Sequence, residues 1–201
     1  MPKTVLPSAT PLPIRLDEAL NKRSSSREGL GGAEIPLADI ASIIGHALAE
    51  RSNGKRPYPS GGALFPIETY MIARSVEKLP MGVYHYAPKA HELERLWDIP
   101  FETTIFEHFP SAEWAEHASA IIIFTAVWRR SEIKYSDFSY LLSLLETGHM
   151  AQNILLTSAA LHIAACPLAG FNDEEVSQLL DIDTEHEQAI YAVVLGKNAS
   201  L

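Results

Sequence analysis

The sequence predicts a single domain of the α+β class. Strand-like runs separated by turn residues gather between residues 67 and 97, as in a meander. Helical patterns stand before and after this cluster, so strands and helices occupy different parts of the chain. The chain has 201 residues, of which 47% are hydrophobic and 20% charged, and it shows no repeat, low-complexity tract or linker. One well-buried core therefore accounts for the whole chain.

The first half predicts an arm, a helix and the meander. Residues 1–15 contain several prolines and no continuous apolar run, which indicates an extended arm rather than a signal peptide. Residues 36–50 place apolar side chains at helical spacing and predict an amphipathic helix. The runs "IETYMIARS", "GVYHYAP" and "HELERLW" then predict three strands, with a Pro-Lys turn between the last two.

The second half predicts more helices and two more strands. "FETTIFEHF" and "AEWAEHA" are typical of helices, and "SAIIIFTAVW" has the continuous β-branched character of a strand buried on both faces. A long helix is expected from about residue 136 to residue 163. "FNDEEVSQLL" predicts a helix that Asn172 caps, with Glu175 three residues further on, and "QAIYAVVLG" predicts a terminal strand.

The long helical pattern lacks a clean polar face. Large apolar side chains cover most of its circumference: Phe138, Leu141, Leu142, Leu144, Leu145, Met150, Ile154, Leu155, Leu156 and Leu161. Such a helix is buried inside a domain or across a subunit interface. A homodimer would supply the second apolar surface.

Charge and cysteine content exclude several classes of partner. Sixteen basic and twenty-five acidic residues give a net charge of −9, which disfavours nucleic acids and anionic membranes as partners. The longest apolar runs are too short or too interrupted for a membrane span of about 20 residues. The single cysteine, Cys166, excludes an internal disulfide and favours a cytoplasmic location; its apolar setting indicates an inert thiol. The absence of G-x-S-x-G also argues against a hydrolase.

Three segments have the composition of ligand-binding loops. "KRSSSREG" combines basic side chains with hydroxyls and suits a phosphate monoester, although a solvated helix end has the same composition. In "RPYPSGGALFP", Gly61 and Gly62 allow backbone amides to approach a planar or anionic ligand, unless the segment is an ordinary turn. In "CPLAGFND", the small residues Ala169 and Gly170 could offer N–H groups to a ligand. The chain has neither a P-loop nor G-x-G-x-x-G, so those nucleotide folds are not expected.

A metal centre is not expected. Glu146 and His149 form one Glu-x-x-His, the spacing found in di-iron helical bundles, but such bundles need a second copy and further carboxylates, and the chain has no second copy. We therefore expect these two residues to form a buried, hydrogen-bonded pair.

Lys134 and Tyr135 stand side by side just before the long helical pattern, in "EIKYSDF". An adjacent Lys and Tyr at a helix start is usually surface chemistry, because lysine is rarely buried. Their place between a buried strand and a buried helix favours a second interpretation. A lysine in a dry cleft can act as a base, and a tyrosine beside it can pass or hold a proton.

Six motifs in order resemble the SagB/McbC-type flavin dehydrogenases of the nitroreductase superfamily. They are "RSSSRE", "PSGGALFPIETY", "GVYHYAP", "IKYSDFSYLLSLLETGHMAQNILL", "CPLAGFND" and the terminal "VLGK". The resemblance runs from about residue 10 to residue 197. It implies a nitroreductase-like α+β fold with a central, mostly antiparallel sheet flanked by helices. It further implies an FMN-binding domain over residues 16–201 and a domain-intertwined homodimer with one FMN at each of two interface sites.

The resemblance also assigns residues to the FMN site. A phosphate clamp falls on Arg23, Ser24, Ser25 and Arg27, and a loop that reaches the flavin from the partner subunit falls on Pro59, Ser60, Gly61 and Ala63. Backbone near the flavin N5 and O4 belongs to Ala169 and Gly170, while Gly196 and Lys197 lie near the phosphate. Lys134 and Tyr135 match the catalytic pair of the family.

The implied activity is the dehydrogenation of an azoline-type ring, thiazoline or oxazoline, or a similar bond in a peptide natural product. Hydride passes to flavin N5 and oxygen reoxidises the flavin. The substrate is a peptide or a carrier-bound small molecule, and other biosynthetic enzymes are possible partners. Two further interpretations stay open: an NAD(P)H-dependent nitro- or quinone reductase, and a non-catalytic flavoprotein that serves as a scaffold in a biosynthetic complex.

Overall fold

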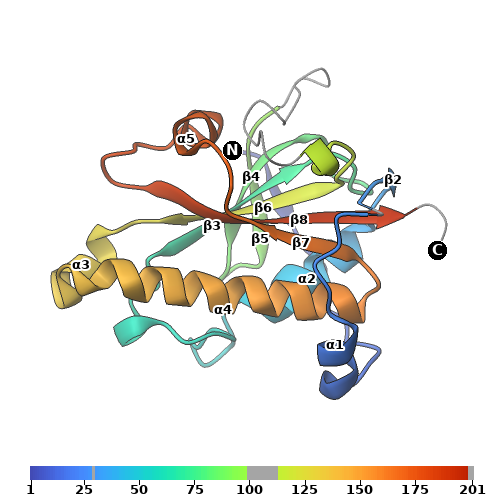
Figure 1. The fold of residues 1–201 in the computed structure, drawn as a ribbon, viewed down its shortest axis with the longest axis horizontal. Helices are drawn as coiled ribbons and strands as arrows, with labels where there is room; N and C mark the ends of the chain where they lie inside the picture. The colour runs from blue at the N-terminus through green and yellow to red at the C-terminus, as the bar shows by residue number, and fades with distance from the viewer. Residues whose placement is uncertain (29, 99–112, 199–201) are drawn as a thin grey trace.

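An eight-stranded sheet forms the centre of the molecule (Figure 1). The computed structural model describes residues 1–28, 30–98 and 113–198. The strand order is β1-β5-β4-β3-β6-β8-β2, and β7 also pairs with β8. Every pairing between these strands is antiparallel, which confirms the predicted α+β class and the antiparallel sheet.

The predicted meander and the two predicted apolar strands form the middle of the sheet. Its strands are β3 (Ile67–Ala73), β4 (Gly82–Ala87), β5 (Glu92–Trp97), β6 (Ala120–Ala126) and β8 (Gln188–Asn198). β6 lies between β3 and β8, and all seven of its residues are buried. The continuous apolar run in the sequence thus reflects a strand covered on both faces.

Three short strands were not predicted. β1 (Lys3–Val5) lies within the proline-rich arm and pairs with β5, and β2 (Gly32–Ala33) pairs with the end of β8. β7 (Ala164–Leu168) begins directly after the predicted end of the long helix at about residue 163, where the sequence predicted no strand. Its alanines and its proline are poor strand formers, and Pro167 is tolerated because β7 pairs only with β8.

The described residues form five α-helices, which are α1 (Leu16–Lys22), α2 (Leu37–Leu48), α3 (Arg129–Tyr135), α4 (Phe138–Ala160) and α5 (Asp173–Leu180). α2, α4 and α5 lie against the sheet, whereas α1 and α3 pack on α4. In Figure 1, α4 crosses the molecule along one face of the sheet, with α2 beside it, and α5 lies on the opposite side. Asn172 caps α5 as predicted, since its side chain accepts from the N–H groups of Glu174 and Glu175.

The core is divided by the sheet. On one face, α2 and α4 bury Ile40, Ile44, Met150 and Ile154 against the sheet residues Met71, Ile122 and Val193. On the other face, α5 contributes Val176 and Leu180, which pack with Ile72, Ile121 and Val194. Neighbouring strand residues therefore serve opposite faces, as the period of a strand requires.

Some predicted helix bounds differ from the structure. The predicted helix at residues 101–109 lies outside the described residues, and of "AEWAEHA" only Glu113–Ala115 forms a short 3-10 turn. The long helix ends at Ala160, three residues early, because His162 has a left-handed backbone with φ of 57°. None of the described helices is long and apolar enough to cross a membrane.

Candidate active site

Lys134 and Tyr135 end a short helix of their own. They are the last two residues of α3, not the first residues of the long helix, because Ser136 adopts φ of 47° and separates α3 from α4. The Lys134 side chain is exposed, the Tyr135 side chain is half-buried, and Lys134 Nζ lies 5.4 Å from the centre of the Tyr135 ring. The dry cleft that a lysine base needs is therefore not formed by one chain alone.

The loop that contains Gly61 and Gly62 folds against this pair. Gly61–Ala63 form a 3-10 turn in which Gly62 has φ of 62°. A Cβ atom at Gly62 would lie 2.9 Å from both Lys134 Nζ and Tyr135 Oη. Two motifs that are more than seventy residues apart in the sequence thus meet in the fold. The backbone conformation favours glycine here, and a Cβ would displace the ends of both side chains.

The same loop has a strained backbone. Besides Gly62, the non-glycine residues Ala63 and Phe65 have positive φ values of 55° and 47°. The Ser60 hydroxyl accepts a hydrogen bond of 3.0 Å from the backbone N–H of Phe65 and so closes the loop. Such conformations cost about 1 kcal/mol or more each and persist where the surroundings fix them.

Glu146 lies beside this loop with only 2% of its surface exposed. Burial raises the pKa of its carboxyl to about 7, against the opposing effects of a hydrogen bond from Ser60 and the positive charge of Arg56. Its Oε1 atom has no hydrogen-bond partner within the described part of the chain. His149, one turn further along α4, is exposed, so the predicted buried pair of Glu146 and His149 is wrong.

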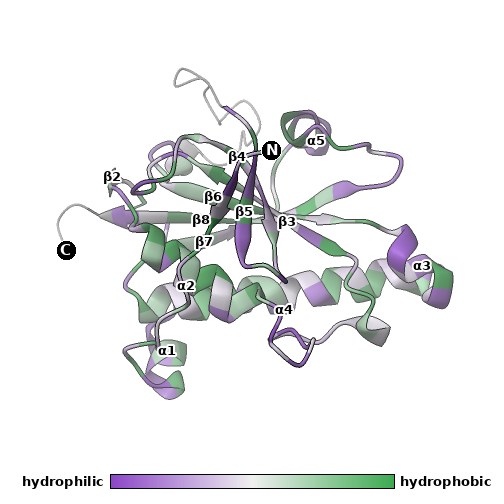
Figure 2. Cartoon of the chain, turned by 180° about the vertical axis from the view of Figure 1, so that it is seen from behind, coloured by the Kyte–Doolittle hydropathy of each residue, from purple (hydrophilic) through white to green (hydrophobic). Residues whose placement is uncertain are grey.

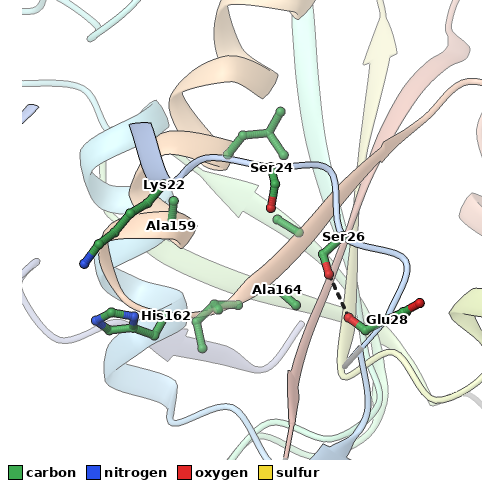
Figure 3. Close-up of a pocket in the computed structure, with 10 residues that line it drawn as sticks. Lys22, Ser24, Ser26, Glu28, Ala159, His162 and Ala164 are labelled. Atoms are coloured by element: carbon green, nitrogen blue, oxygen red, sulfur yellow. Dashed lines mark hydrogen bonds between the residues drawn. The ribbon is translucent and has the colours of Figure 1, made fainter. Parts of the chain in front are cut away.

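The basic and serine-rich segment borders a cavity of about 420 Å³ at the other end of α4 (Figure 3). The lining residues are Lys22, Ser24, Ser26, Glu28, Leu155, Ala159, His162, Ile163, Ala164 and Ala165. The backbone N–H of Ser26 donates to the carbonyl of Ala165 over 3.0 Å, which holds the segment along β7. The Ser26 hydroxyl donates to the carbonyl of Glu28 over 2.8 Å.

The predicted clamp residues divide between two sides of this extended segment. Ser24 lines the cavity, whereas Arg23, Ser25 and Arg27 alternate with the lining residues. The guanidinium of Arg27 lies over the ring of Trp114 at 5.5 Å, on the side of the Cys166 thiol. Burial raises the pKa of the buried Cys166 thiol, and Arg27 opposes this effect.

The remaining predicted site residues lie along β7 and β8. A Cβ atom at Gly196 would lie 1.8 Å from the carbonyl oxygen of Leu30, so close packing of two backbones already requires this glycine. Lys197 Nζ is 4.0 Å from Asp39 Oδ2, at the limit of an ion pair. Ala169 and Gly170 follow the last residue of β7 and are exposed.

The predicted site residues therefore form two separate groups on one chain. Lys134, Tyr135 and the glycine loop lie at the start of α4, where a Cβ atom at Gly61 would be 3.1 Å from the Leu142 side chain. The cavity with Ser24 lies at the end of α4, at Ala159. Along the helix axis Leu142 and Ala159 are roughly 26 Å apart. One chain does not bring the two groups into contact with one small ligand.

The first half of α4 exposes its large apolar side chains. They are Phe138, Tyr140, Leu141, Leu144 and Leu145, each 37% to 57% exposed. The buried side of the same turns instead carries Ser139, Ser143 and Thr147, which are small and polar. Figure 2 shows this mixture of apolar and polar residues along the length of α4.

Gly148 has no atom within 4 Å of a Cβ built on it, so the backbone is open to a neighbour there. The predicted second covering surface is not supplied by this chain.

Sequence reasoning missed several residues of both groups. Lys22, Ser26 and His162 line the cavity but were not assigned to the site. The two-residue period of an extended segment would have separated Ser24 and Ser26 from Arg23 and Arg27. Gly62 was expected to let backbone amides approach a ligand, and Glu146 to pair with His149. The contacts that the two residues make instead depend on the packing of α3 and the loop on α4.

Comparison with known proteins identifies relatives over nearly the whole chain. The nitroreductase family model matches residues 20–197. The Methanocaldococcus jannaschii protein MJ1384, named as a nitroreductase, is 28% identical over 170 residues, which cover 84% of this chain and 85% of that protein. The microcin B17-processing protein McbC of Escherichia coli is 26% identical and is matched over 75% of this chain and 58% of its own length. The trifolitoxin-processing protein TfxB of Rhizobium leguminosarum bv. trifolii is 25% identical, over 98% of this chain and 57% of its own length.

Solved structures show the same fold. A protein of Ralstonia eutropha JMP134 described as a nitroreductase superimposes with a TM-score of 0.83 at 22% identity, over 99% of this chain and 90% of that one. A chain of the E. coli microcin synthetase McbBCD complex, with truncated pro-MccB17 bound, superimposes with a TM-score of 0.74 at 22% identity, over 94% of this chain and 74% of that one. Together with the McbC and TfxB matches, these confirm the resemblance to the SagB/McbC branch.

Proposed function

The chain belongs to the nitroreductase family, and we propose that it is an FMN-dependent oxidoreductase that dehydrogenates a thiazoline or oxazoline ring, or a similar bond, in a peptide natural product. The relatives McbC and TfxB support this substrate class, since their names describe the processing of microcin B17 and trifolitoxin. This chain spans 58% of McbC and 57% of TfxB. That it shares the activity of either whole protein is therefore part of the proposal.

The observation that carries the proposal is the contact of Gly62 with Lys134 and Tyr135. Lys134 Nζ and Tyr135 Oη each lie 2.9 Å from the position that a Cβ atom at Gly62 would occupy. Because Gly62 has no side chain, that space next to both groups stays open. Lys134 or Tyr135 takes the proton from the substrate carbon, as a general base in contact with the reacting atom. The backbone of the glycine loop keeps the two groups together while this happens.

The site is completed in a homodimer. The apolar face of α4, formed by Phe138, Tyr140, Leu141, Leu144 and Leu145, pairs with the same face of a second copy. With the two α4 helices antiparallel, the glycine loop of one copy reaches the cavity of the other. This arrangement also covers Lys134, which is exposed in the single chain, and excludes water from it.

The residues around the cavity suit FMN. Lys22 and Ser24 supply a cation and a hydroxyl for its phosphate, and the proposed clamp adds Arg23, Ser25 and Arg27. Backbone at Ala169, Gly170 and Gly196, the Lys197 ammonium, and the partner subunit's copies of Pro59, Ser60, Gly61 and Ala63 would complete the site. Bound FMN supplies the hydride acceptor, which oxygen regenerates. The protein supplies position, a dry environment and the base.

Two measurements test the proposal. Purified protein should be yellow, and FMN should raise its melting temperature; a colourless protein that FMN does not stabilise would contradict the cofactor assignment. With FMN bound, Lys134→Ala or Tyr135→Phe should lower turnover of an azoline-containing peptide by about 100-fold or more. Lys89→Ala, a change at an exposed lysine in the turn between β4 and β5, is the control. Full turnover in both site variants would remove the catalytic assignment.

A second candidate is an NAD(P)H-dependent nitro- or quinone reductase. MJ1384 favours it, because its name assigns it to the nitroreductases and the match covers most of both chains. Rapid bleaching of the flavin by NADPH without any peptide would support this function. The McbBCD complex with its bound peptide instead supports a peptide substrate and partner enzymes, so turnover should also be measured with candidate partners added.

A further inference from the structure

Glu146 is a buried carboxyl outside the reacting pair. We propose that Glu146 is a positioning residue: its carboxylate holds the Ser60 hydroxyl and thereby fixes Gly61 and Gly62 against Lys134 and Tyr135. The link to turnover rests on the proposed function. The effect on the loop does not, and it can be measured on its own.

A line of contacts connects Glu146 to the catalytic pair. The Ser60 hydroxyl is near enough to the Glu146 carboxyl to lower its pKa as a hydrogen-bond donor. The Ser60 oxygen also accepts from the Phe65 N–H at 3.0 Å, so Ser60 closes the glycine loop on the side that faces Glu146. Gly62, between those ends, touches the tips of Lys134 and Tyr135. A shift of Ser60 therefore moves the surface on which the catalytic pair rests.

The loop needs such a tie because its backbone is strained. Positive φ values at Gly62, Ala63 and Phe65 fall within four residues. Only the hydrogen bonds of the loop and its packing on α3 and α4 keep these conformations populated. Gly61 packs closely on Leu142, one turn before Glu146 on α4, and so gives the loop a second contact with the same helix.

Among the described neighbours of Glu146, Ser60 is the candidate hydrogen-bond donor, because Arg56 is directed toward other groups. Arg56 does not form an ion pair with Glu146 among the described residues: its guanidinium lies 4.2 Å from the centre of the Phe65 ring and donates to the Tyr58 hydroxyl over 2.9 Å. Burial raises the pKa of Tyr58 to about 12, so Tyr58 stays neutral at ordinary pH. Arg56 and Tyr58 are the charged and titratable groups that face Glu146 from the preceding loop.

Glu146 therefore changes its charge where its neighbours do not. Burial raises its pKa to about 7, although the positive charge of Arg56 acts in the opposite direction. The ionised carboxylate is the stronger acceptor for the Ser60 hydroxyl. The loop should accordingly be held more firmly above pH 7 than below it.

Amide hydrogen exchange of residues 60–65 in the FMN-loaded protein tests the tie directly. After correction for intrinsic rates, protection in the wild type should fall roughly tenfold between pH 8 and pH 6. Glu146→Gln keeps an acceptor oxygen and cannot titrate, so its protection should not depend on pH. Glu146→Leu and Ser60→Ala should each lower protection at both pH values.

Matched variants separate positioning from a general effect on folding. Ser143→Ala removes another buried polar group of α4, one whose hydroxyl only bonds to the Ser139 carbonyl over 2.9 Å, and it should leave loop protection and its pH dependence unchanged. The double variant of Glu146→Leu and Ser60→Ala should lose no more protection than Ser60→Ala alone, because Ser60→Ala already removes the contact with Glu146 together with the hydrogen bond from the Phe65 N–H. Additive losses, or a pH-independent wild type, overturn the proposal.

Turnover gives the second measurement. In the wild type, kcat for an azoline-containing peptide should rise with pH near pH 7. This rise should be absent from the pH profile of Glu146→Gln. If the wild type binds FMN and turns over no azoline, the proposed function fails, while the exchange experiment still decides whether Glu146 holds the loop. If turnover is present and the rise of kcat near pH 7 is unchanged in Glu146→Gln, the positioning role is wrong.

Discussion

Gly62 shows how two constraints meet at one residue. Its backbone has φ of 62°, and its missing side chain leaves room for Lys134 Nζ and Tyr135 Oη. A residue with a Cβ would have a strained backbone and would displace the side-chain ends of Lys134 and Tyr135.

Replacing Gly62 by alanine should affect turnover more than stability. The strained backbone should lower the free energy of unfolding by about 1 kcal/mol, while the displaced Lys134 and Tyr135 should lower kcat at least tenfold. Gly54→Ala is a matched control, since Gly54 has φ of 74° and no atom within 4 Å of a Cβ built on it. Urea unfolding and turnover of both variants make the comparison. Equal effects on kcat would contradict the role assigned to Gly62.

At this scale the sequence named candidate residues without their contacts. Lys134, Tyr135 and Gly61 were candidates because their chemistry and spacing are visible in one short stretch each. The role of Glu146 was not, because it depends on Ser60, which lies more than eighty residues earlier.

Among the elements, α4 is turned with its large apolar side chains outward over its first half. Ser139, Ser143 and Thr147 face the domain, while Leu141 and Leu145 face away from it. Apolar content alone predicted burial of this helix, but only the fold shows which side remains to be covered.

A charge on the exposed face of α4 should separate the proposed dimer. Leu141→Asp with Leu145→Asp should yield monomers with weak FMN binding and little change in the unfolding of each chain, because both side chains are exposed in the single chain. Light scattering after size exclusion measures the mass. Val5→Asp changes an exposed apolar residue on β1 and should leave the mass unchanged. A variant that keeps both the mass and the FMN affinity of the wild type would show that this face is not the interface.

Element boundaries were harder to predict where backbone conformation, not hydrophobic pattern, decides them. Ser136, with φ of 47°, divides what reads as one helical run into α3 and α4. β7 was not predicted as a strand because pairing with β8, rather than the strand propensity of alanine and proline, gives it that conformation.

For the whole molecule, the two protonation states of Glu146 have opposite effects. The protonated form favours the stability of the fold, and the ionised form favours order in the glycine loop. Its pKa is raised from 4.5 to about 7, so the folded state binds a proton more tightly than the unfolded chain. This contribution to stability is fully present below the unfolded pKa, near 4.5, and is lost as pH rises through 7. The ionised form that holds Ser60 is thus the less stable form of the fold.

The free energy of unfolding should accordingly fall by about 3 kcal/mol between pH 4.5 and pH 8 through this group alone. Glu146→Gln should lack that share of the pH dependence. The plots of unfolding free energy against pH for the wild type and for Glu146→Gln should therefore not be parallel. Urea unfolding at fixed protein concentration and several pH values measures the difference. Parallel curves for the wild type and Glu146→Gln would show that the carboxyl titrates near its ordinary pKa.

The overall class was predictable because the meander strands β3, β4 and β5 follow one another along the chain and pair in that order, with helical patterns on either side. The architecture of the site was not, because neither the opposite positions of its two groups along α4 nor the uncovered face between them is encoded in any one stretch.

The separation of those two groups has a consequence for genetics. If each site takes its base from one subunit and its phosphate donors from the other, a subunit with Lys134→Ala and a subunit with Ser24→Ala plus Arg23→Ala complement each other. In their mixed dimer one site carries both defects and the other carries none. Mixing two inactive proteins through unfolding and refolding should therefore restore roughly a quarter of wild-type activity, whereas refolding either protein alone should restore none.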